Sequence, residues 1–454
     1  MKTLAKSPID EAHIENGVVT AAPRRATRRI RRIVLGSLLS GWLMAGVLTL
    51  VVFGGAREHM ITGSALLGFS FGWAMLAVLS IRMTDQPQRW AAVPAAAMGA
   101  TGLGLLLLTP DDGGLTTAGW VWPPLLLALA IWIGLRTRRA LAKRSGRWAL
   151  YAVVGLTGLA AIGGMFETIV LSSDRSRYPM PGQSFDVGGH ALHLNCTGSG
   201  SPTVVLQSGL GEFSPQWSHI VRAINPTTRV CAYDRAGQGW SDDLPYAQDG
   251  IMAATDLHTL LAHAGEQGPF VLSGHSIGGS YAMTFAARYP EDVAGMVLLD
   301  STDPYHASPM FGSPRAPASA VFAVLPSIAR MGIGHLFPSS STLPELAAGQ
   351  VEAFWTSPRG WRNYSDDIAA IPVLLYQAQA LTTFGSRPLI VLTAAEQEQP
   401  AAHERMAALS TNSSHLFTEE THSGLLQEVS GAAVSADAIG AVVQAVRTGS
   451  ELSR

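Results

Sequence analysis

Residues 270–280 constrain this chain most, because an apolar run, a Gly-x-Ser-x-Gly core and a helical pattern follow one another there without a gap. The apolar run predicts a strand, and the apolar spacing after it predicts a helix that stops before Pro290. A serine at such a turn has a strained backbone that projects its hydroxyl clear of the sheet, and flanking side chains would collide. Gly274 and Gly278 flank Ser276, which we predict to be a nucleophile. The alternative is a glycine-rich turn with an idle serine.

The chain is too apolar for a purely soluble protein, and its long apolar runs lie in the first third. The whole sequence of 454 residues is 47% hydrophobic and only 14% charged, and its mean hydropathy is +0.22. A helix needs about 20 apolar residues to cross a bilayer. Five runs come near or exceed this length, namely residues 33–56, 60–81, 90–109, 119–135 and 148–171. We therefore expect five membrane spans, of which the fourth, short and containing Pro123 and Pro124, could instead be a buried or re-entrant segment.

Basic residues predict the orientation of these spans. Residues 1–32 end in a cluster of arginines, and the loops between spans two and three and between four and five are also basic, whereas the other two loops hold Arg57 or no basic residue. Cytoplasmic loops collect Lys and Arg. We expect a disordered basic cytoplasmic tail over residues 1–32, a transmembrane region over 33–171, a linker over 172–182 and an extracytoplasmic domain over 183–454. The uneven charge concerns membrane orientation and not nucleic acid, and the lipid bilayer is an expected partner.

The part of the chain after residue 182 has an α/β pattern. Eight short apolar runs, at residues 183–187, 191–196, 203–207, 229–233, 270–273, 295–300, 388–393 and 414–419, predict strands. Gly188 and Gly189 separate the first two, which indicates a β-hairpin. Helical patterns lie between most of the later runs, and this alternation predicts a mostly parallel sheet.

The residues around Ser276 resemble the nucleophile elbow of the α/β-hydrolase fold family, and the resemblance covers about residues 181–447. It implies an eight-stranded, mostly parallel sheet that begins with an antiparallel strand. Residues 304–387 are far longer than a simple connection, and in this family such an insertion forms a mostly helical cap over the active site. Its aromatic residues favour an apolar acyl or aromatic substrate over a sugar or phosphate. They are Phe311, Phe322, Phe337, Phe354, Trp355, Trp361 and Tyr364.

A serine needs an adjacent base before it becomes a good nucleophile. In the family the histidine follows the last strand, and His422 stands in that position. His415 lies inside the predicted last strand, and His275 is fixed beside the serine and points elsewhere. We therefore expect His422 to be the base, with an ordinary loop histidine as the alternative.

The acid that orients this histidine is less clearly marked. The family usually carries an aspartate after the seventh strand, but this chain has Gln397 at that position. Some members carry the acid at the end of the sixth strand, where this chain has Asp300. We predict that Asp300 completes the triad, ahead of Glu396, Glu398 and Asp303, and the alternative is a turn aspartate that caps the strand end.

The resemblance also implies an oxyanion hole made of backbone N–H groups. One donor is expected from Ile277, directly after the nucleophile, and the second from the loop after the third strand, where Leu210 is the candidate. Cys196 and Cys231 fall on the second and fourth predicted strands, which are neighbours in the family's strand order. A disulfide is therefore possible, and two reduced, buried thiols are the alternative.

These features predict a membrane-anchored serine hydrolase of the cell membrane that cleaves a small, apolar carboxylic ester through an acyl-enzyme on Ser276. A peptidase of the same fold is one alternative, and a non-catalytic membrane sensor or binding protein is another. No metal-ligand cluster and no phosphate-binding glycine loop stand out in the sequence, so no cofactor is expected.

Overall fold

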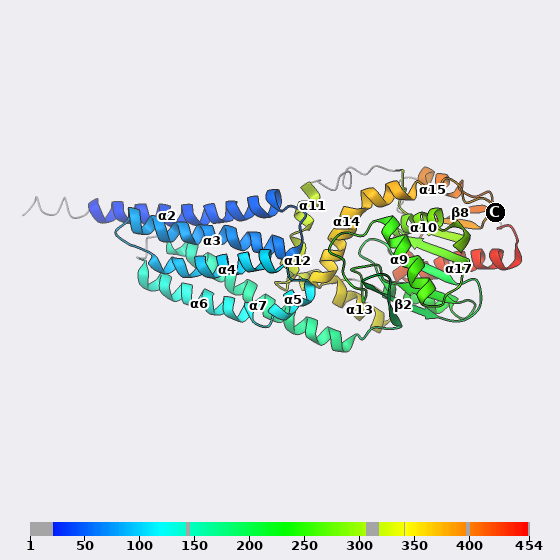
Figure 1. Ribbon diagram of the computed structural model, residues 1–454, viewed down its shortest axis with the longest axis horizontal. Helices are drawn as coiled ribbons and strands as arrows, with labels where there is room; N and C mark the ends of the chain where they lie inside the picture. Colours follow the sequence, from blue (N-terminus) through cyan, green and yellow to red (C-terminus); the bar gives the residue numbers. More distant parts are fainter. Residues whose placement is uncertain (1–20, 142–145, 306–316, 340, 396–399, 453–454) are drawn as a thin grey trace, which may run out of the picture. The chain divides into compact units, whose positions relative to one another are not determined.

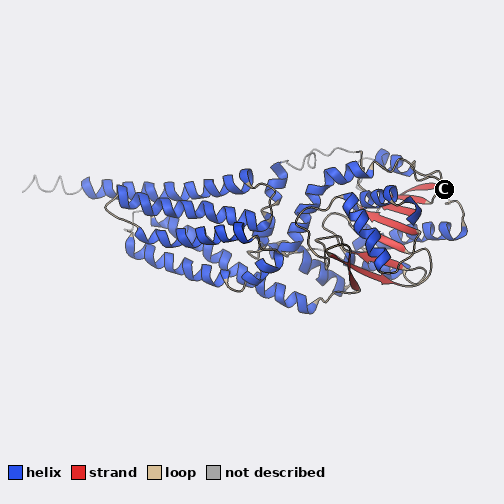
Figure 2. Ribbon diagram, viewed as in Figure 1, coloured by secondary structure: helices blue, strands red, loops and turns tan. Residues whose placement is uncertain are grey.

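The computed structural model of the chain describes residues 21–141, 146–305, 317–339, 341–395 and 400–452. The chain divides into two compact units, Met1–Thr168 and Ile169–Arg454. The described part of the first unit is helical, and the second unit holds all eight strands (Figure 1, Figure 2).

The described part of the first unit consists of helices, most of them long and apolar. They are α2 (Ala21–Val47) with its π-helical continuation η1 (Leu48–Val52), α3 (Glu58–Met83), η2 (Arg89–Ala91) with α4 (Ala92–Leu108), α5 (Asp112–Ala118), α6 (Trp122–Ala140) and α7 (Arg147–Arg177). The last of them, α7, continues past Thr168 into the second unit. Large apolar side chains lie on the outside, including Leu107 and Leu108, which are 79% and 80% exposed. Such a surface suits lipid better than water.

Four single helical segments of this unit, Arg29–Val52, Glu58–Met83, Arg89–Leu108 and Arg147–Arg177, are long and apolar enough to cross a membrane. The fourth predicted span, residues 119–135, is not one continuous helix. It falls on the short break after α5 and on most of α6, and α5 and α6 are bent by 47° at this break. Pro123 and Pro124 occupy the first turn of α6. Proline is tolerated there because the first helical N–H groups have no intrahelical acceptor.

Two predicted boundaries are corrected by the helices. The tail expected to be disordered over residues 1–32 is helical from Ala21, because its alanines and arginines are good helix formers and continue directly into the apolar run. Part of the linker expected over residues 172–182 belongs to α7, which ends at Arg177. Pro179 and Pro181 then prevent further helix.

The second unit is organised around one sheet. Its strands are β1 (Gln183–Asp186), β2 (Ala191–Thr197), β3 (Val204–Gln207), β4 (Val230–Tyr233), β5 (Phe270–His275), β6 (Val293–Leu299), β7 (Leu389–Thr393) and β8 (Ser413–Phe417). Their order is β1-β2-β4-β3-β5-β6-β7-β8. The pairs β1–β2 and β2–β4 are antiparallel and all other neighbours are parallel. Each strand lies within two residues of its predicted bounds, and the predicted opening hairpin is present.

Helices cover both faces of this sheet. One apolar core contains residues of α9 (Gly250–His263), α10 (Ile277–Arg288) and α15 (Pro400–Ala407). The other contains residues of α8 (Ser218–Ile224), α16 (Gly424–Gln427) and α17 (Val429–Thr448), and η3 (Ser214–Trp217) supplies Trp217. By length and composition α17 could also cross a membrane, but Ile439, Val442 and Val443 pack in this core. We therefore assign α17 to the core of the second unit.

The two cysteines are joined. Cys196 of β2 and Cys231 of β4 are direct partners in the antiparallel register, and a disulfide links them. The same two sulfurs, with Glu266, form the one described group of metal-ligating residues with suitable spacing. Disulfide-bonded sulfurs are not thiolate ligands, so this group is not a metal site as it stands.

The described part of the insertion between β6 and β7 is mostly helical. It contains α11 (Pro317–Phe322), α12 (Leu325–Ala329), η5 (Ile333–Leu336), α13 (Glu345–Trp355) and α14 (Pro358–Ala378). Phe311 lies outside the described residues. Three of the other predicted aromatics meet one another, because the ring of Tyr364 contacts both Phe322 and Trp355.

Candidate active site

Ser276 stands at a sharp turn between β5 and α10. Its φ of 56° and ψ of −128° make it one of three described non-glycine residues with a positive φ. Such a conformation costs free energy and is kept where the surrounding structure enforces it. The strand, the turn and the helix follow one another as the sequence predicts.

The glycines of the turn are required by close backbone approach. A Cβ at Gly274 would lie 2.5 Å from the carbonyl oxygen of Gly278, and a Cβ at Gly278 would lie 2.1 Å from the carbonyl oxygen of Gln207. Real Cβ atoms do not approach this closely, so the end of β3 and the start of α10 can meet only without these side chains.

Hydrogen bonds tie the turn to the segment that carries Asp300. The N–H of Ser276 donates to the carbonyl of Leu299 at 3.1 Å, and the N–H of Thr302 donates to the carbonyl of Ser276 at 3.0 Å. Asp300 itself has a φ of 41°, and its N–H donates to Leu392 at 2.7 Å. The two strained residues therefore belong to one hydrogen-bonded framework at the carboxyl ends of β5, β6 and β7.

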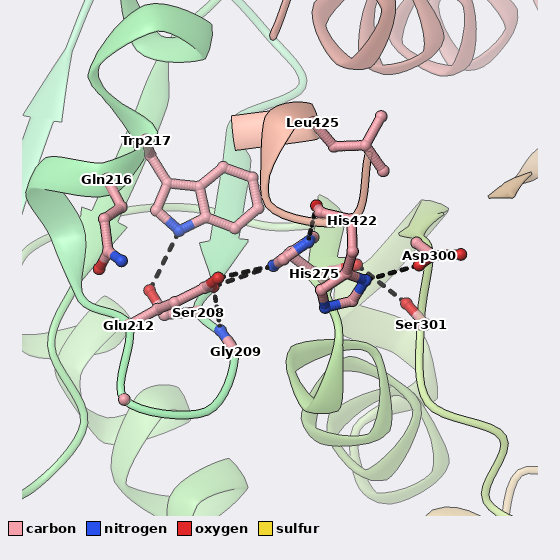
Figure 3. Close-up of polar contacts among 12 residues, drawn as sticks. Ser208, Gly209, Glu212, Gln216, Trp217, His275, Asp300, Ser301, His422 and Leu425 are labelled. Atoms are coloured by element: carbon pink, nitrogen blue, oxygen red, sulfur yellow. Dashed lines mark hydrogen bonds and ion pairs between the residues drawn. The ribbon is translucent and has the colours of Figure 1, made fainter. Parts of the chain in front are cut away.

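Asp300 and His422 form an acid–histidine pair (Figure 3). His422 Nδ1 lies 2.5 Å from Asp300 Oδ2, and the N–H of Ala394 donates to Asp300 Oδ1 at 3.1 Å. Burial alone would raise the pKa of Asp300, but the hydrogen bonds from His422 and Ala394 outweigh it and lower that pKa. A carboxylate that stays ionised there can fix the imidazole tautomer with its proton on Nδ1, leaving Nε2 as a base.

The second nitrogen of His422 is open. The His422 side chain is 42% exposed, whereas that of Asp300 is 5% exposed. Within the described residues, Nε2 of His422 has no hydrogen-bond partner, and the Ser276 hydroxyl is not hydrogen-bonded to it. Catalytic hydrogen bonds are often long before substrate binds, so this spacing does not exclude a base at His422.

Of the other candidate acids, the structure describes Asp303. Asp303 is buried and accepts a hydrogen bond from Arg405 at 2.5 Å, so it is engaged away from His422. Glu396 and Glu398, like Gln397, lie outside the described residues. Among the described carboxylates, Asp300 is the one hydrogen-bonded to His422.

The predicted oxyanion donors flank the turn. Ile277 begins α10, and Leu210 lies in the loop after β3, whose residue Gly209 approaches Ser276 so closely that an added Cβ would be 3.0 Å from the serine Cβ. In the described part of the chain, neither the N–H of Leu210 nor that of Ile277 donates to a protein acceptor. Two unengaged backbone donors beside a serine are the arrangement that an oxyanion requires.

Three charged residues that sequence reasoning left without a role fix this loop. Arg235 is buried and donates to the carbonyls of Ser208 at 2.6 Å and Gly209 at 3.2 Å. Asp367 of α14 lies 3.5 Å from Arg235 and accepts from the N–H of Gly211 at 3.2 Å.

The third of these residues is Glu212, which accepts from the N–H of Gly209 at 2.6 Å. Glu212 and Arg235 are charged residues inside glycine-rich loops, and this was the signal in the sequence that could have identified them. Nothing in the sequence marks Asp367, which lies far along the chain.

Cap residues surround the same loop. A Cβ at Gly211 would lie 3.1 Å from the Tyr364 ring and 3.2 Å from the Trp355 ring. Leu210 packs against a buried apolar cluster that includes Ile277 and, from α14, Ile371, Leu374 and Leu375. Apolar side chains therefore pack beside both predicted oxyanion donors, next to the charged residues that fix the loop.

Comparisons with known proteins concern the fold of this part of the chain. Residues 202–330 match the sequence model of the alpha/beta hydrolase fold. An uncharacterized protein of Schizosaccharomyces pombe is 33% identical over 152 residues, which are 27% of this chain and 28% of that protein. The uncharacterized protein YbdG of Bacillus subtilis is 28% identical over 202 residues, which are 44% of this chain and 60% of YbdG. The chain thus spans less than two thirds of either relative.

A solved thermophilic esterase from Thermogutta terrifontis is 22% identical, with a TM-score of 0.44, and the match covers 57% of this chain and 94% of that chain. The region of the family match contains β3 to β6 and the turn at Ser276. The eight-stranded, mostly parallel sheet has the strand order given above. The family match over residues 202–330 and this sheet show that the second unit has the α/β-hydrolase fold.

Proposed function

We propose that this chain is a membrane-anchored serine hydrolase that cleaves carboxylic esters through an acyl-enzyme on Ser276. The observation that carries the proposal is the strained Ser276 on the same framework as the Asp300–His422 pair. A strained serine with glycine neighbours, a histidine with one open nitrogen and a buried acid behind it are the parts that acyl transfer needs.

In the first half of the reaction His422 Nε2 takes the proton of the Ser276 hydroxyl while the oxygen attacks the ester carbonyl. The carbonyl oxygen becomes an oxyanion, which the N–H groups of Leu210 and Ile277 bind. Each such donor contributes about 3 kcal/mol in the transition state. The imidazolium, stabilised by Asp300, then protonates the departing alcohol, and the acyl group stays on Ser276.

In the second half water replaces the alcohol. His422 Nε2 removes a proton from that water, the hydroxide attacks the acyl carbonyl, and the oxyanion forms again against the same two N–H groups. Collapse of this intermediate breaks the bond to Ser276 and returns the proton to the serine oxygen. The products are a carboxylic acid and an alcohol, with no cofactor in either half.

The surroundings of the loop favour an apolar acyl group. Leu210 packs against aliphatic side chains and Tyr281, and the aromatic rings of Trp355 and Tyr364 lie close to Gly211. Apolar side chains beside a few directed N–H groups suit an ester whose polar part is confined to its carbonyl.

The helical unit supports a location in the cell membrane, with the N-terminus in the cytoplasm and the hydrolase unit outside. The basic loops alternate with loops of little positive charge along the chain, as the positive-inside rule expects for five spans. The Cys196–Cys231 disulfide also favours an extracytoplasmic hydrolase unit, because such bonds persist in oxidising compartments.

A membrane-impermeant, serine-reactive phosphonate tests the proposal on intact cells. The wild-type chain should be labelled and Ser276→Ala should not, while Ser430→Ala, at an exposed serine of α17, should label like the wild type. Labelling only after lysis would overturn the orientation. If a folded wild-type chain stays unlabelled before and after lysis, the hydrolase proposal fails.

A further inference from the structure

His275 is a buried histidine that the proposed reaction does not use. It is the last residue of β5, directly before Ser276. Its Nδ1 lies 2.9 Å from Glu212 Oε1, and its Nε2 lies 2.9 Å from the backbone carbonyl oxygen of His422. Its ring also lies against that of His422, with 4.4 Å between centroids. Both of its nitrogens therefore face oxygen atoms within the proposed site (Figure 3).

Glu212 connects this histidine to the loop after β3. Its Oε2 accepts from the N–H of Gly209 at 2.6 Å, and Gly209 directly precedes Leu210. Because the Gly209 N–H is taken by Glu212, it is not available to an oxyanion, whereas the Leu210 N–H is. The carboxylate of Glu212 thus determines which N–H of this loop stays open.

The charge state of the pair follows from its neighbours. Burial alone would lower the pKa of His275, but Glu212, the carbonyl of His422 and the charge of Asp300 raise it. Burial alone would raise the pKa of Glu212, but His275 and the Gly209 N–H lower it. Arg235 adds a buried positive charge near Glu212. An imidazolium that donates from both nitrogens satisfies both oxygen partners, which a neutral imidazole beside a carboxylate cannot do.

We propose that Glu212 and His275 are positioning residues that act as one hydrogen-bonded bridge between the loop of Leu210 and the backbone of His422. The proposal rests on the proposed function, since it concerns the same oxyanion donor and the same base. The bridge joins segments that are far apart in the chain, because Glu212 and His275 are 63 positions apart and His275 and His422 are 147 apart. Its effect is to keep the oxyanion donor and the base in register on either side of Ser276.

The size of the expected effect comes from the precision that catalysis needs. A displacement of about 1 Å in a catalytic group can lower the rate by about 10²-fold. Loss of the bridge should change the transition state more than substrate binding, because the cap residues that contact an apolar acyl group do not belong to it. The expected signature is therefore a lower kcat with little change in KM.

Two substitutions at Glu212 separate the bridge from simple packing. In the full-length protein in detergent, with a short-chain p-nitrophenyl ester and active sites counted with the phosphonate, Glu212→Ala should lower kcat by about 30–100-fold. Glu212→Gln should stay within about 5-fold of wild type. Its amide can accept from the Gly209 N–H and donate to Nδ1 of a neutral His275, whose Nε2–H still donates to His422.

His275→Asn breaks the other half of the bridge. An asparagine amide reaches the Nδ1 position and so keeps Glu212 engaged, but it is too short to reach the carbonyl of His422. We expect kcat to fall by at least about 10-fold. The double variant Glu212→Ala/His275→Ala should be no slower than the slower single alanine variant, because residues that act as a unit are not additive.

A matched control comes from a second described imidazole that is buried between a carboxylate and a carbonyl, His193. His193→Gln should lower the melting temperature without lowering kcat. Folding of every variant is measured by thermal unfolding, and if the alanine variants do not fold, Glu212→Gln and His275→Asn decide.

The bridge is overturned if a folded Glu212→Ala or His275→Asn keeps kcat within about 3-fold of wild type, or if Glu212→Gln is as slow as Glu212→Ala. Failure of the underlying function has a different signature. In that case Ser276→Ala keeps the esterase activity of the wild type, or the wild type has none.

Discussion

Two acid–histidine pairs in the hydrolase unit have similar parts and different surroundings. In both, Nδ1 of the histidine faces an aspartate that follows a strand, at 2.5 Å for His422 and Asp300 and at 2.8 Å for His193 and Asp234. His193 is fully buried, and its Nε2 lies 2.5 Å from the carbonyl oxygen of Pro181. His422 is partly exposed, and its Nε2 has no partner among the described residues. An acid–histidine pair can therefore act as a base only if its second nitrogen remains open.

Further bonds also hold the His193–Asp234 pair in place. Asp234 also accepts from the N–H groups of Ser214 at 2.8 Å and Trp240 at 3.1 Å. A disulfide joins β2 and β4 close to this pair. Its Cys231 lies three positions before Asp234, and its Cys196 lies three positions after His193. We call β2, β4, His193 and Asp234 together the β2–β4 region. It combines the features of a rigid structural element, whereas the region of Ser276 keeps open hydrogen-bonding groups.

The largest predicted effect on kcat comes from the Asp300–His422 pair. Asp300→Asn should lower kcat by about 10⁴-fold, as loss of the acid does in serine triads, because His422 loses the partner that fixes its tautomer. Ester hydrolysis by purified variants measures this. Asp303→Asn, which changes a nearby buried aspartate paired with Arg405, should stay within about 3-fold of wild type. If Asp300→Asn keeps more than about a tenth of the activity, a different acid orients His422.

Within the β2–β4 region, removal of the disulfide should lower the free energy of unfolding the most. Cys196 and Cys231 are separated by 35 positions, and closing a loop of this length stabilises the folded state by about 4 kcal/mol. The double variant Cys196→Ser/Cys231→Ser should lose about this free energy of unfolding, measured by chemical denaturation, with kcat within about 3-fold of wild type. A loss of kcat as large as Asp300→Asn causes would show that the two regions are coupled.

His193→Gln should destabilise the same β2–β4 region by a somewhat smaller amount. Removing one partner of a buried charged pair typically costs about 3–5 kcal/mol, and the amide of glutamine recovers part of this because it can still form one hydrogen bond. A fall of about 2–3 kcal/mol in the free energy of unfolding, with unchanged kcat, is expected. No change in stability would mean that the pair contributes only conformational specificity.

The smallest effect is on the pH dependence of stability. Burial alone would lower the pKa of His193, but Asp234 and the Pro181 carbonyl raise it. The raised pKa gives stability that is fully present below the unfolded value of about 6.5 and is lost as the pH rises through the folded pKa. Burial alone would raise the pKa of Asp234, but its hydrogen bonds lower it, so its contribution is present above about 4 and lost as the pH falls further.

Thermal unfolding from pH 3 to pH 10 measures both the loss of stability at alkaline pH and the loss at acid pH. The melting temperature should be highest between about pH 4.5 and 6.5 and fall on either side. In His193→Gln the decline on the alkaline side should be shallower, because one raised histidine pKa is removed. An identical alkaline decline in both proteins would assign it to other groups, of which His275 is the next candidate, since its pKa is also raised.

Much of the fold follows from local sequence patterns. Short runs with strand-forming residues, most of them bounded by glycine or proline, predict all eight strands because β-propensity and turn chemistry act over a few residues. The fourth membrane span is less predictable. Whether Pro123 and Pro124 begin a helix or interrupt one depends on the packing of the surrounding helices, and the structure has a bent pair there.

The sequence by itself determined the nucleophile candidate and the sheet. A Gly-x-Ser-x-Gly turn between a strand and a helix has its geometry imposed by local sterics, since Gly274 and Gly278 leave room for close backbone approach. The position of His422 after the last strand was likewise readable, because chain order fixes which loop reaches the carboxyl edge of the sheet.

Only the tertiary structure decided which charged groups meet. Asp300 and Asp303 are close in sequence and chemically alike, yet the backbone at positive φ turns Asp300 toward His422 while Asp303 meets Arg405. Glu212 and His275 become partners through the pairing of β3 with β5. Such contacts depend on side-chain direction and on segments distant in the chain, and local sequence patterns specify neither.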